Sequence, residues 1–110
     1  MIEPAYIYRA KLDRIIDGDT AVFMVDLGFK TFSAVTCRVR GVSAPEPTGI
    51  TKPEGLAAKE YSYNLLTGKD LIIQSYHDRM SFARWVCDVW LDTGDAWAER
   101  LIEAGHGVES

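Results

Sequence analysis

The sequence has no long hydrophobic run, and this absence excludes a transmembrane helix. Its longest segment without Asp, Glu, Lys or Arg is residues 61–68, whereas a helix that spans a bilayer needs about 20 apolar residues. The first residues, Met1 to Tyr6, contain no basic region followed by an apolar stretch, so they do not form a signal peptide. We therefore expect a cytoplasmic protein without membrane contacts.

Cysteine is also scarce, with only Cys37 and Cys87 in 110 residues. Two distant cysteines cannot make a zinc motif or a disulfide scaffold. Each lies in an apolar, strand-like segment, which favours two buried free thiols over a disulfide.

The chain lacks an excess of basic residues. Its formal net charge is −4, and the acidity is concentrated at the end: residues 1–87 carry 11 basic and 10 acidic side chains, a net of +1, and residues 88–110 carry 1 and 6, a net of −5. A strong non-specific polyanion binder normally has a clear basic excess. The balance is still compatible with an enzyme that acts on phosphodiesters in a small, locally positive cleft.

What is present is a globular composition, with 47% hydrophobic and 25% charged residues, and a length typical of one domain, residues 1–110. Alternating apolar residues and turn signals predict strands, and four-residue spacing predicts helices. Strands are predicted at 6–16, 20–25, 31–40, 71–76 and 83–91, a loop at 41–53, and helices at 54–66 and after an Asp95 cap, with Trp97, Leu101 and Ile102 forming the apolar stripe of the second helix.

This order, β-β-β-α-β-β-α, is that of the OB-fold. We therefore predict a mainly β (α+β) protein: a five-stranded Greek-key barrel with about two helices.

Three segments contain residues suited to phosphodiester chemistry. Taken separately, Asp17 and Asp19 flank an ordinary hairpin turn, while Arg38, Glu46 and Arg84 are ordinary surface residues. Taken together, Asp19 would hold a hard cation, Glu46 would handle a water molecule, and the two arginines would clamp a phosphate. Hydrolysis of a phosphodiester needs a positioned or activated water and cationic stabilisation of a crowded, negative transition state.

In this order and spacing the segments resemble the staphylococcal nuclease (thermonuclease) family, from about Tyr8 to Val108. The landmarks are Ile16-Asp17-Gly18-Asp19-Thr20, Arg38 followed by Pro45-Glu46, Pro53-Glu54, Phe82-Ala83-Arg84 and Leu101-Ile102-Glu103-Ala104-Gly105. The resemblance implies a calcium ligand at Asp19 with Asp17 and Thr20 in support. It also implies phosphate-binding arginines at Arg38 and Arg84, and a general base at Glu46.

The chain departs from the family at two places of the cation site. Ser43 stands where the family has a second calcium-ligating aspartate, and a neutral hydroxyl is a weaker ligand than a carboxylate. Ala44 replaces a threonine and keeps only the backbone carbonyl, the atom expected to bind calcium. The Tyr-Gly-Arg of the family becomes Phe82-Ala83-Arg84, which removes a hydroxyl that touches phosphate.

Two functions follow from these observations. The first is a calcium-dependent nuclease that hydrolyses single-stranded or double-stranded DNA, or RNA, with low sequence specificity. The second is a catalytically degenerate nuclease-like module that binds nucleic acid or a protein partner. Ser43 and the acidic end of the chain favour the module, whereas Arg38, Glu46 and Arg84 favour the enzyme.

Overall fold

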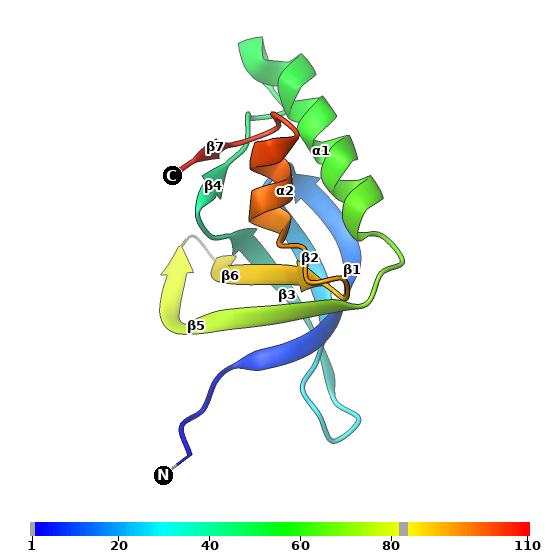
Figure 1. Cartoon of the computed structure of the whole chain (residues 1–110), viewed down its shortest axis with the longest axis vertical. Coiled ribbons are helices and arrows are strands. Elements are labelled where there is room, and N and C mark those ends of the chain that lie inside the picture. Colours follow the sequence, from blue (N-terminus) through cyan, green and yellow to red (C-terminus); the bar gives the residue numbers. More distant parts are fainter. Residues whose placement is uncertain (1, 82–83) are drawn as a thin grey trace.

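Five strands of the chain close into a barrel (Figure 1). The computed structural model describes residues 2–81 and 84–110, with the backbone alone for residues 77–81. The barrel order is β1-β2-β3-β6-β5, and β5 pairs again with β1. Every pair is antiparallel except β3 with β6. The strands are β1 (Ile7–Asp17), β2 (Thr20–Asp26), β3 (Phe32–Val39), β5 (Leu71–Ser81) and β6 (Arg84–Leu91).

The two-residue period of the strands builds the core. Successive side chains of a strand point to opposite faces, so alternate residues of a barrel strand point inward. In β3 the inward residues are Cys37 and Val39, and Arg38 between them points out; in β6 Cys87, Val89 and Leu91 are buried. The largest fully buried side chains include Trp97 and Phe23, whose rings meet edge to face.

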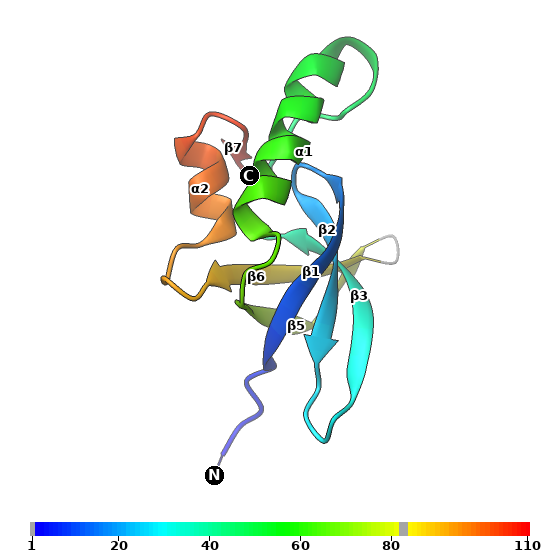
Figure 2. The same ribbon diagram turned by 90° about the vertical axis from the view of Figure 1, so that its right-hand side faces the viewer.

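Two helices, α1 (Lys52–Leu66) and α2 (Trp97–Glu103), lie at the same end of the barrel. Figure 2 shows the hairpin between β2 and β3 at the opposite end. A short 3₁₀ turn, η1 (Gly49–Thr51), precedes α1. Helix α1 buries Ala58, Ser62 and Leu66, which share one face because helical residues four apart are neighbours.

The predicted fold class is confirmed: the structure is a closed five-stranded mixed barrel with two helices. Helix α1 begins two residues earlier than predicted because Pro53 occupies its first turn, where a proline costs no hydrogen bond. Asp95 is not the cap of α2. The N-cap is Ala96, and the Asp95 carboxylate accepts a hydrogen bond from Thr93 Oγ1 at 2.8 Å.

The sequence also missed a two-stranded ribbon. Strands β4 (Val42–Ser43) and β7 (Val108–Glu109) pair antiparallel, and β4 lies inside the predicted loop 41–53. Two-residue strands are too short to show any periodicity. Strand β5 runs on to Ser81, five residues past its predicted end. Phe82 and Ala83 lie outside the described residues.

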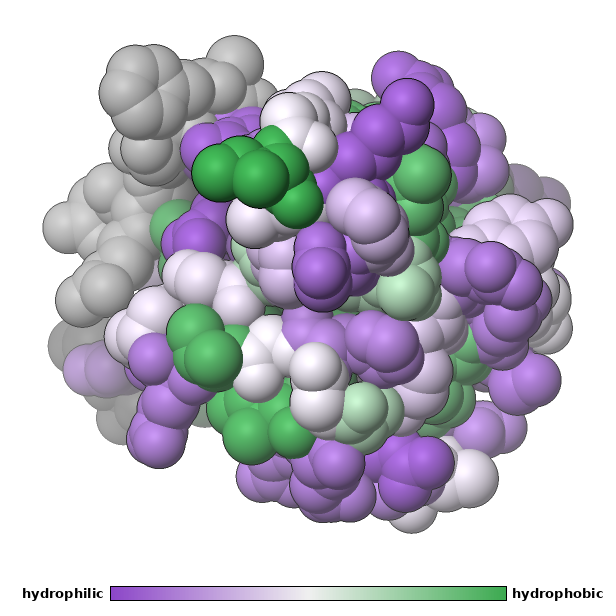
Figure 3. Space-filling view, turned by 90° about the horizontal axis from the view of Figure 1, so that it is seen from above, coloured by the Kyte–Doolittle hydropathy of each residue, from purple (hydrophilic) through white to green (hydrophobic). Residues whose placement is uncertain are grey.

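Viewed from the helix end, the described residues present hydrophilic and hydrophobic side chains in small mixed groups (Figure 3). Within residues 2–81 and 84–110, neither helix is both long and apolar enough to cross a membrane.

Candidate active site

A polar pocket of about 310 Å³ opens where β1 turns into β2. The strand register explains which residues meet there. Thr20 of β2 pairs with Arg38 of β3, and Arg38 pairs in turn with Val86 of β6, so the three strands present one row of residues. The pocket is lined by Asp17, Asp19, Arg38, Ser43, Ala44, Glu46, Arg84 and Val86.

Seven of the eight residues predicted from the sequence line this pocket. The eighth, Thr20, is 1% exposed and lies behind the pocket wall. Its hydroxyl donates a hydrogen bond to Oδ1 of Asp19, which does line the pocket, at 3.0 Å. The structure therefore brings the predicted residues to one place. Their roles as ligands, base and phosphate clamp remain predictions.

Asp19 is buried and has several partners in the pocket. It is 7% exposed, its Oδ2 accepts a hydrogen bond from the Ala44 amide at 3.0 Å, and Arg38 Nη2 lies 3.6 Å from the same oxygen. Burial alone would raise the pKa of Asp19, but hydrogen bonds from Asp17, the Ala44 amide and Thr20, together with the Arg38 charge, lower it below its usual value. Asp19 is therefore ionised.

Asp17 behaves in the opposite way. Burial is the largest cause that raises the pKa of Asp17, and together with the hydrogen bond and the charge of the neighbouring Asp19 it brings the pKa to about 6. Its Oδ1 accepts a hydrogen bond from the Asp19 amide at 3.2 Å. Two adjacent carboxylates disfavour double ionisation, so on acidification Asp17 takes up a proton before Asp19 does.

Arg38 contacts both Asp19 and Ser43, the second of which belongs to β4. Its Nη2 donates to Ser43 Oγ at 3.0 Å and lies within ion-pair distance of Asp19. The side chain is 32% exposed, so the guanidinium group still reaches the solvent of the pocket. An arginine has five N–H donors, which suits it to hold Ser43 and Asp19 while presenting other donors to an anion.

Glu46 is exposed, and helix α1 fixes its backbone. Thr51 Oγ1 donates to the Glu46 carbonyl at 2.8 Å, and a Cβ added at Gly55 would lie 2.2 Å from the same carbonyl oxygen. Only a glycine permits so close an approach. The sequence offered one weak signal for this contact, a glycine inside a helical pattern.

The turn that carries the two aspartates is held by a chain of hydrogen bonds from both helices. Trp97 Nε1 of α2 donates to Ser62 Oγ of α1 at 2.9 Å, and Ser62 Oγ donates to the Gly18 carbonyl at 2.8 Å. A Cβ at Gly18 would lie 2.7 Å from the Cβ atoms of Ala44 and Ala58. Sequence reasoning missed Ser62 as a supporting residue, because nothing in a helical pattern shows which turn a serine will reach.

The pocket offers only oxygen atoms to a cation. Calcium prefers six to eight oxygen ligands, with carboxylates foremost, and Asp17, Asp19, Ser43 and Glu46 all line this pocket. The donor chemistry therefore fits a hard divalent cation. Among the described residues, however, no three acidic, histidine or cysteine side chains are gathered closely enough to hold a metal ion by themselves. Both Asp19 oxygens and the Ser43 hydroxyl already take part in hydrogen bonds within the protein, which points to weak binding. The contact found for Ala44 involves its amide rather than its carbonyl.

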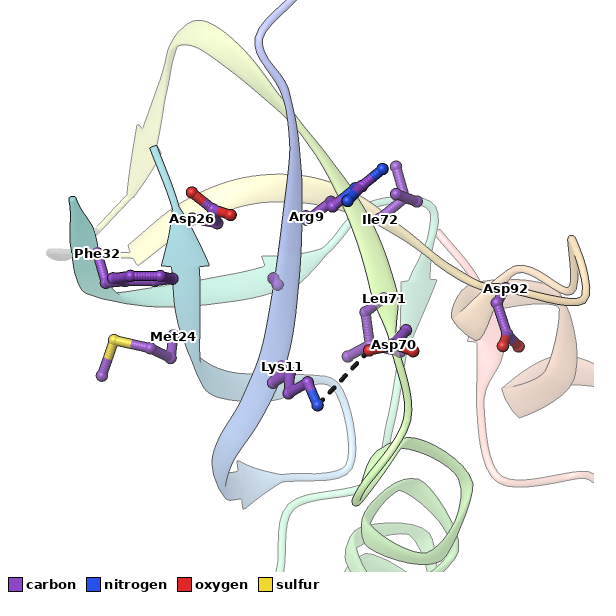
Figure 4. A pocket seen from close by; sticks show the side chains of 10 residues that line it. Arg9, Lys11, Met24, Asp26, Phe32, Asp70, Leu71, Ile72 and Asp92 are labelled. Carbon is purple, nitrogen blue, oxygen red and sulfur yellow. Dashed lines mark ion pairs between the residues drawn. The ribbon is translucent and has the colours of Figure 1, made fainter. Parts of the chain in front are cut away.

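A second cavity, larger at about 500 Å³, lies along β1, β2 and β5 (Figure 4). Its walls combine apolar side chains such as Met24, Phe32 and Leu71 with charged residues at the rim. Lys11 and Asp70 form an ion pair there at 3.5 Å, with side chains that are 68% and 79% exposed. None of the predicted site residues lines this cavity.

No protein-family model matches the chain, and no curated protein matches it either. The polar pocket, with its buried Asp19 and its two arginines, is therefore the feature of the molecule that bears on function.

Proposed function

We propose that the chain is a metal-dependent nuclease that hydrolyses phosphodiester bonds of DNA or RNA with low sequence specificity. One observation carries the proposal. Two arginines, Arg38 and Arg84, and the exposed Glu46 line the same small pocket as the buried, ionised Asp19. A module that only binds has no need of this combination.

Each residue has a role that its environment supports. Arg38 and Arg84 would bind the non-bridging oxygens of a phosphate, because a planar guanidinium matches them with paired hydrogen bonds. Glu46 would orient a water molecule and accept its proton as the phosphorus is attacked. Asp19 holds Arg38 in place across 3.6 Å.

Asp19, Ser43 and the carbonyl of Ala44 would hold the divalent cation, with Asp17 and Thr20 in support. When bound there, calcium would neutralise charge on the phosphate in the transition state.

Hydrolysis of single-stranded DNA, double-stranded DNA and RNA by the purified protein, in calcium and in chelator, tests the proposal. Arg38→Ala and Glu46→Gln should each lower the rate by about 10²–10³-fold, as expected when an electrostatic stabiliser or a catalytic base is removed. The matched control is Lys11→Ala, a cation exposed at the larger cavity, which should stay within about twofold of wild type. Hydrolysis that persists in chelator, or that survives both pocket variants, would show that the proposal is wrong.

The second candidate function is a degenerate module that binds nucleic acid or a protein without cleaving it. The observation in its favour is Ser43, whose hydroxyl oxygen accepts a hydrogen bond from Arg38 at the position where a second anionic ligand is expected.

Ser43→Asp separates the two functions. A second carboxylate should tighten calcium binding by about tenfold, the equivalent of 1.4 kcal/mol of extra attraction in a partly solvated site. Calorimetry measures the affinity, and a calcium titration of hydrolysis measures activity. A gain in both supports the enzyme, and tighter binding without hydrolysis supports the module. Unchanged binding would show that position 43 is not a ligand position.

A further inference from the structure

Two cysteines meet inside the barrel at a place that the proposed nuclease chemistry does not use. Cys37 of β3 and Cys87 of β6 are both free and 1% exposed, and their Sγ atoms lie 3.0 Å apart. They belong to neighbouring parallel strands, in which Val39 is the register partner of Cys87. Residues 50 positions apart in the sequence are thus in side-chain contact.

The two thiols form part of the wall of a third pocket, of about 250 Å³. Its other walls include Tyr8, Trp85 and Leu27, and Leu27 is 44% exposed. The pocket therefore reaches the surface, and its volume admits a molecule of a few heavy atoms. Because each cysteine is only 1% exposed, we expect that only an oxidant as small as hydrogen peroxide reaches the sulfur atoms from this pocket.

We propose that Cys37 and Cys87 are a modification site, an oxidisable pair that hydrogen peroxide converts into an intrachain disulfide in the folded protein. A disulfide has an S–S distance of about 2.05 Å, so the sulfur atoms must approach by roughly 1 Å. Both side chains already point into the same interior. The proposal does not depend on the nuclease activity.

The chemistry balances in two steps. The sulfur of one cysteine attacks a peroxide oxygen, the O–O bond breaks, and hydroxide leaves and takes up the thiol proton as water, which produces a sulfenic acid. The second sulfur then attacks the sulfenic sulfur, the S–O bond breaks, and a second water departs with the remaining thiol proton. The two thiols lose two electrons, and peroxide gains them.

The environment of the pair favours the second step over further oxidation. A sulfenic acid condenses with a neighbouring thiol to form a disulfide, and here the sulfur atoms of Cys37 and Cys87 are in contact. The first step should be slow, because the hydrogen bond with Cys37 and burial both raise the pKa of Cys87 and only the thiolate is strongly nucleophilic.

The disulfide would join β3 and β6, whose pairing in the barrel is short. β3 and β6 share three paired positions, against seven between β2 and β3. A cross-link between distant residues restricts the unfolded chain more than a local one does. The oxidised protein should therefore be more stable than the reduced protein.

The experiment treats the folded, metal-free protein with hydrogen peroxide, alkylates remaining thiols, and maps peptides without reduction by mass spectrometry. The expected result is a loss of roughly 2 Da with the 37–87 peptides linked, and a rise in Tm of roughly 10 °C that reductant reverses. Cys37→Ala and Cys87→Ala serve as matched controls. Each keeps one thiol and should show neither the link nor the peroxide-dependent rise in Tm.

Three results would overturn the proposal. They are thiols that stay reduced or become separate sulfinic acids in the folded protein, links between two chains instead of within one, and a lower Tm after oxidation. All readouts are masses and melting temperatures, so failure of this proposal is distinct from failure of the nuclease proposal.

Discussion

The two larger pockets of the molecule differ in how firmly their charged groups are held. In the 310 Å³ polar pocket, Asp19 is buried, and both of its oxygens accept hydrogen bonds from the protein. In the 500 Å³ cavity, the charges of Lys11 and Asp70 are paired on the surface and mostly exposed. The smaller pocket is the better candidate for chemistry, because catalysis depends on groups fixed in advance of the reaction.

The difference comes from the helices. Both helices lie at one end of the barrel (Figure 1). Ser62 and Gly55 of α1 reach the Gly18 and Glu46 carbonyls of the polar pocket. The lining of the larger cavity comes from residues 9–11, 24, 26, 32, 70–72 and 92, none of which belongs to a helix. Paired substitutions at the two places test this contrast.

Gly55→Ala should have the largest effect. The new methyl group would meet the Glu46 backbone at 2.2 Å, so either α1 or the Glu46 loop must shift. We expect a loss of about 3 kcal/mol in the free energy of unfolding, the upper end for an overpacked site, together with slower hydrolysis. Urea denaturation and the DNA assay measure the two effects.

The matched variant is Gly28→Ala in the hairpin between β2 and β3, away from both helices. Gly28 has φ +82° but nothing within 4 Å of an added Cβ, so alanine there incurs only backbone strain of about 1 kcal/mol. Hydrolysis by this variant should be unchanged. Equal losses of stability and activity in both variants would show that the helices do not hold the polar pocket more firmly than the rest of the barrel is held.

Ser62→Ala should have an intermediate effect. It leaves the buried Trp97 Nε1 and the Gly18 carbonyl without the partner they share, which costs about 2 kcal/mol. Thr31→Ala is the control. Its hydroxyl donates to the Phe29 carbonyl at the exposed hairpin at 3.4 Å, and its loss should change the unfolding free energy by less than about 0.5 kcal/mol. Chemical denaturation gives both values, and similar losses would contradict the role assigned to Ser62.

The smallest expected effect is a pH dependence at Asp17. Its pKa rises from 3.8 to about 6 in the folded protein, so the folded state binds the proton more tightly than the unfolded chain does. Ionisation of Asp17 therefore costs stability as the pH rises through that window. Asp17→Asn removes the cost.

Measured in chelator, the stability of Asp17→Asn relative to wild type should increase by about 1 kcal/mol between pH 4 and pH 7, an amount reduced by partial solvent exposure. Asp70→Asn, which breaks only the exposed pair with Lys11, should change stability by less than about 0.5 kcal/mol at either pH. Parallel pH profiles for Asp17→Asn and wild type would show that Asp17 is not perturbed.

Much of the fold and the membership of the site could be predicted from local sequence. The five barrel strands and two helices follow from periodicity, and Asp17, Asp19, Arg38, Glu46 and Arg84 lie at strand ends or in a proline turn that the sequence marks plainly. The ribbon of β4 and β7 could not be predicted, since each strand has two residues and depends on its partner for pairing. The Asp95 cap was wrong because a capping residue is recognised only when the first turn of the helix is known.

What the sequence by itself determined is the alternation that makes a barrel, the absence of an apolar membrane helix, and the identities of the acidic and basic residues available for chemistry. Only the tertiary structure decided that Ser62 and Gly55 support the polar pocket, and that Cys37 contacts Cys87. The physical reason is the same in each case. These contacts join residues of different elements, through the packing of α1 on the β1–β2 turn and on the loop that carries Glu46, and through the parallel pairing of β3 with β6. No local pattern records where such elements meet.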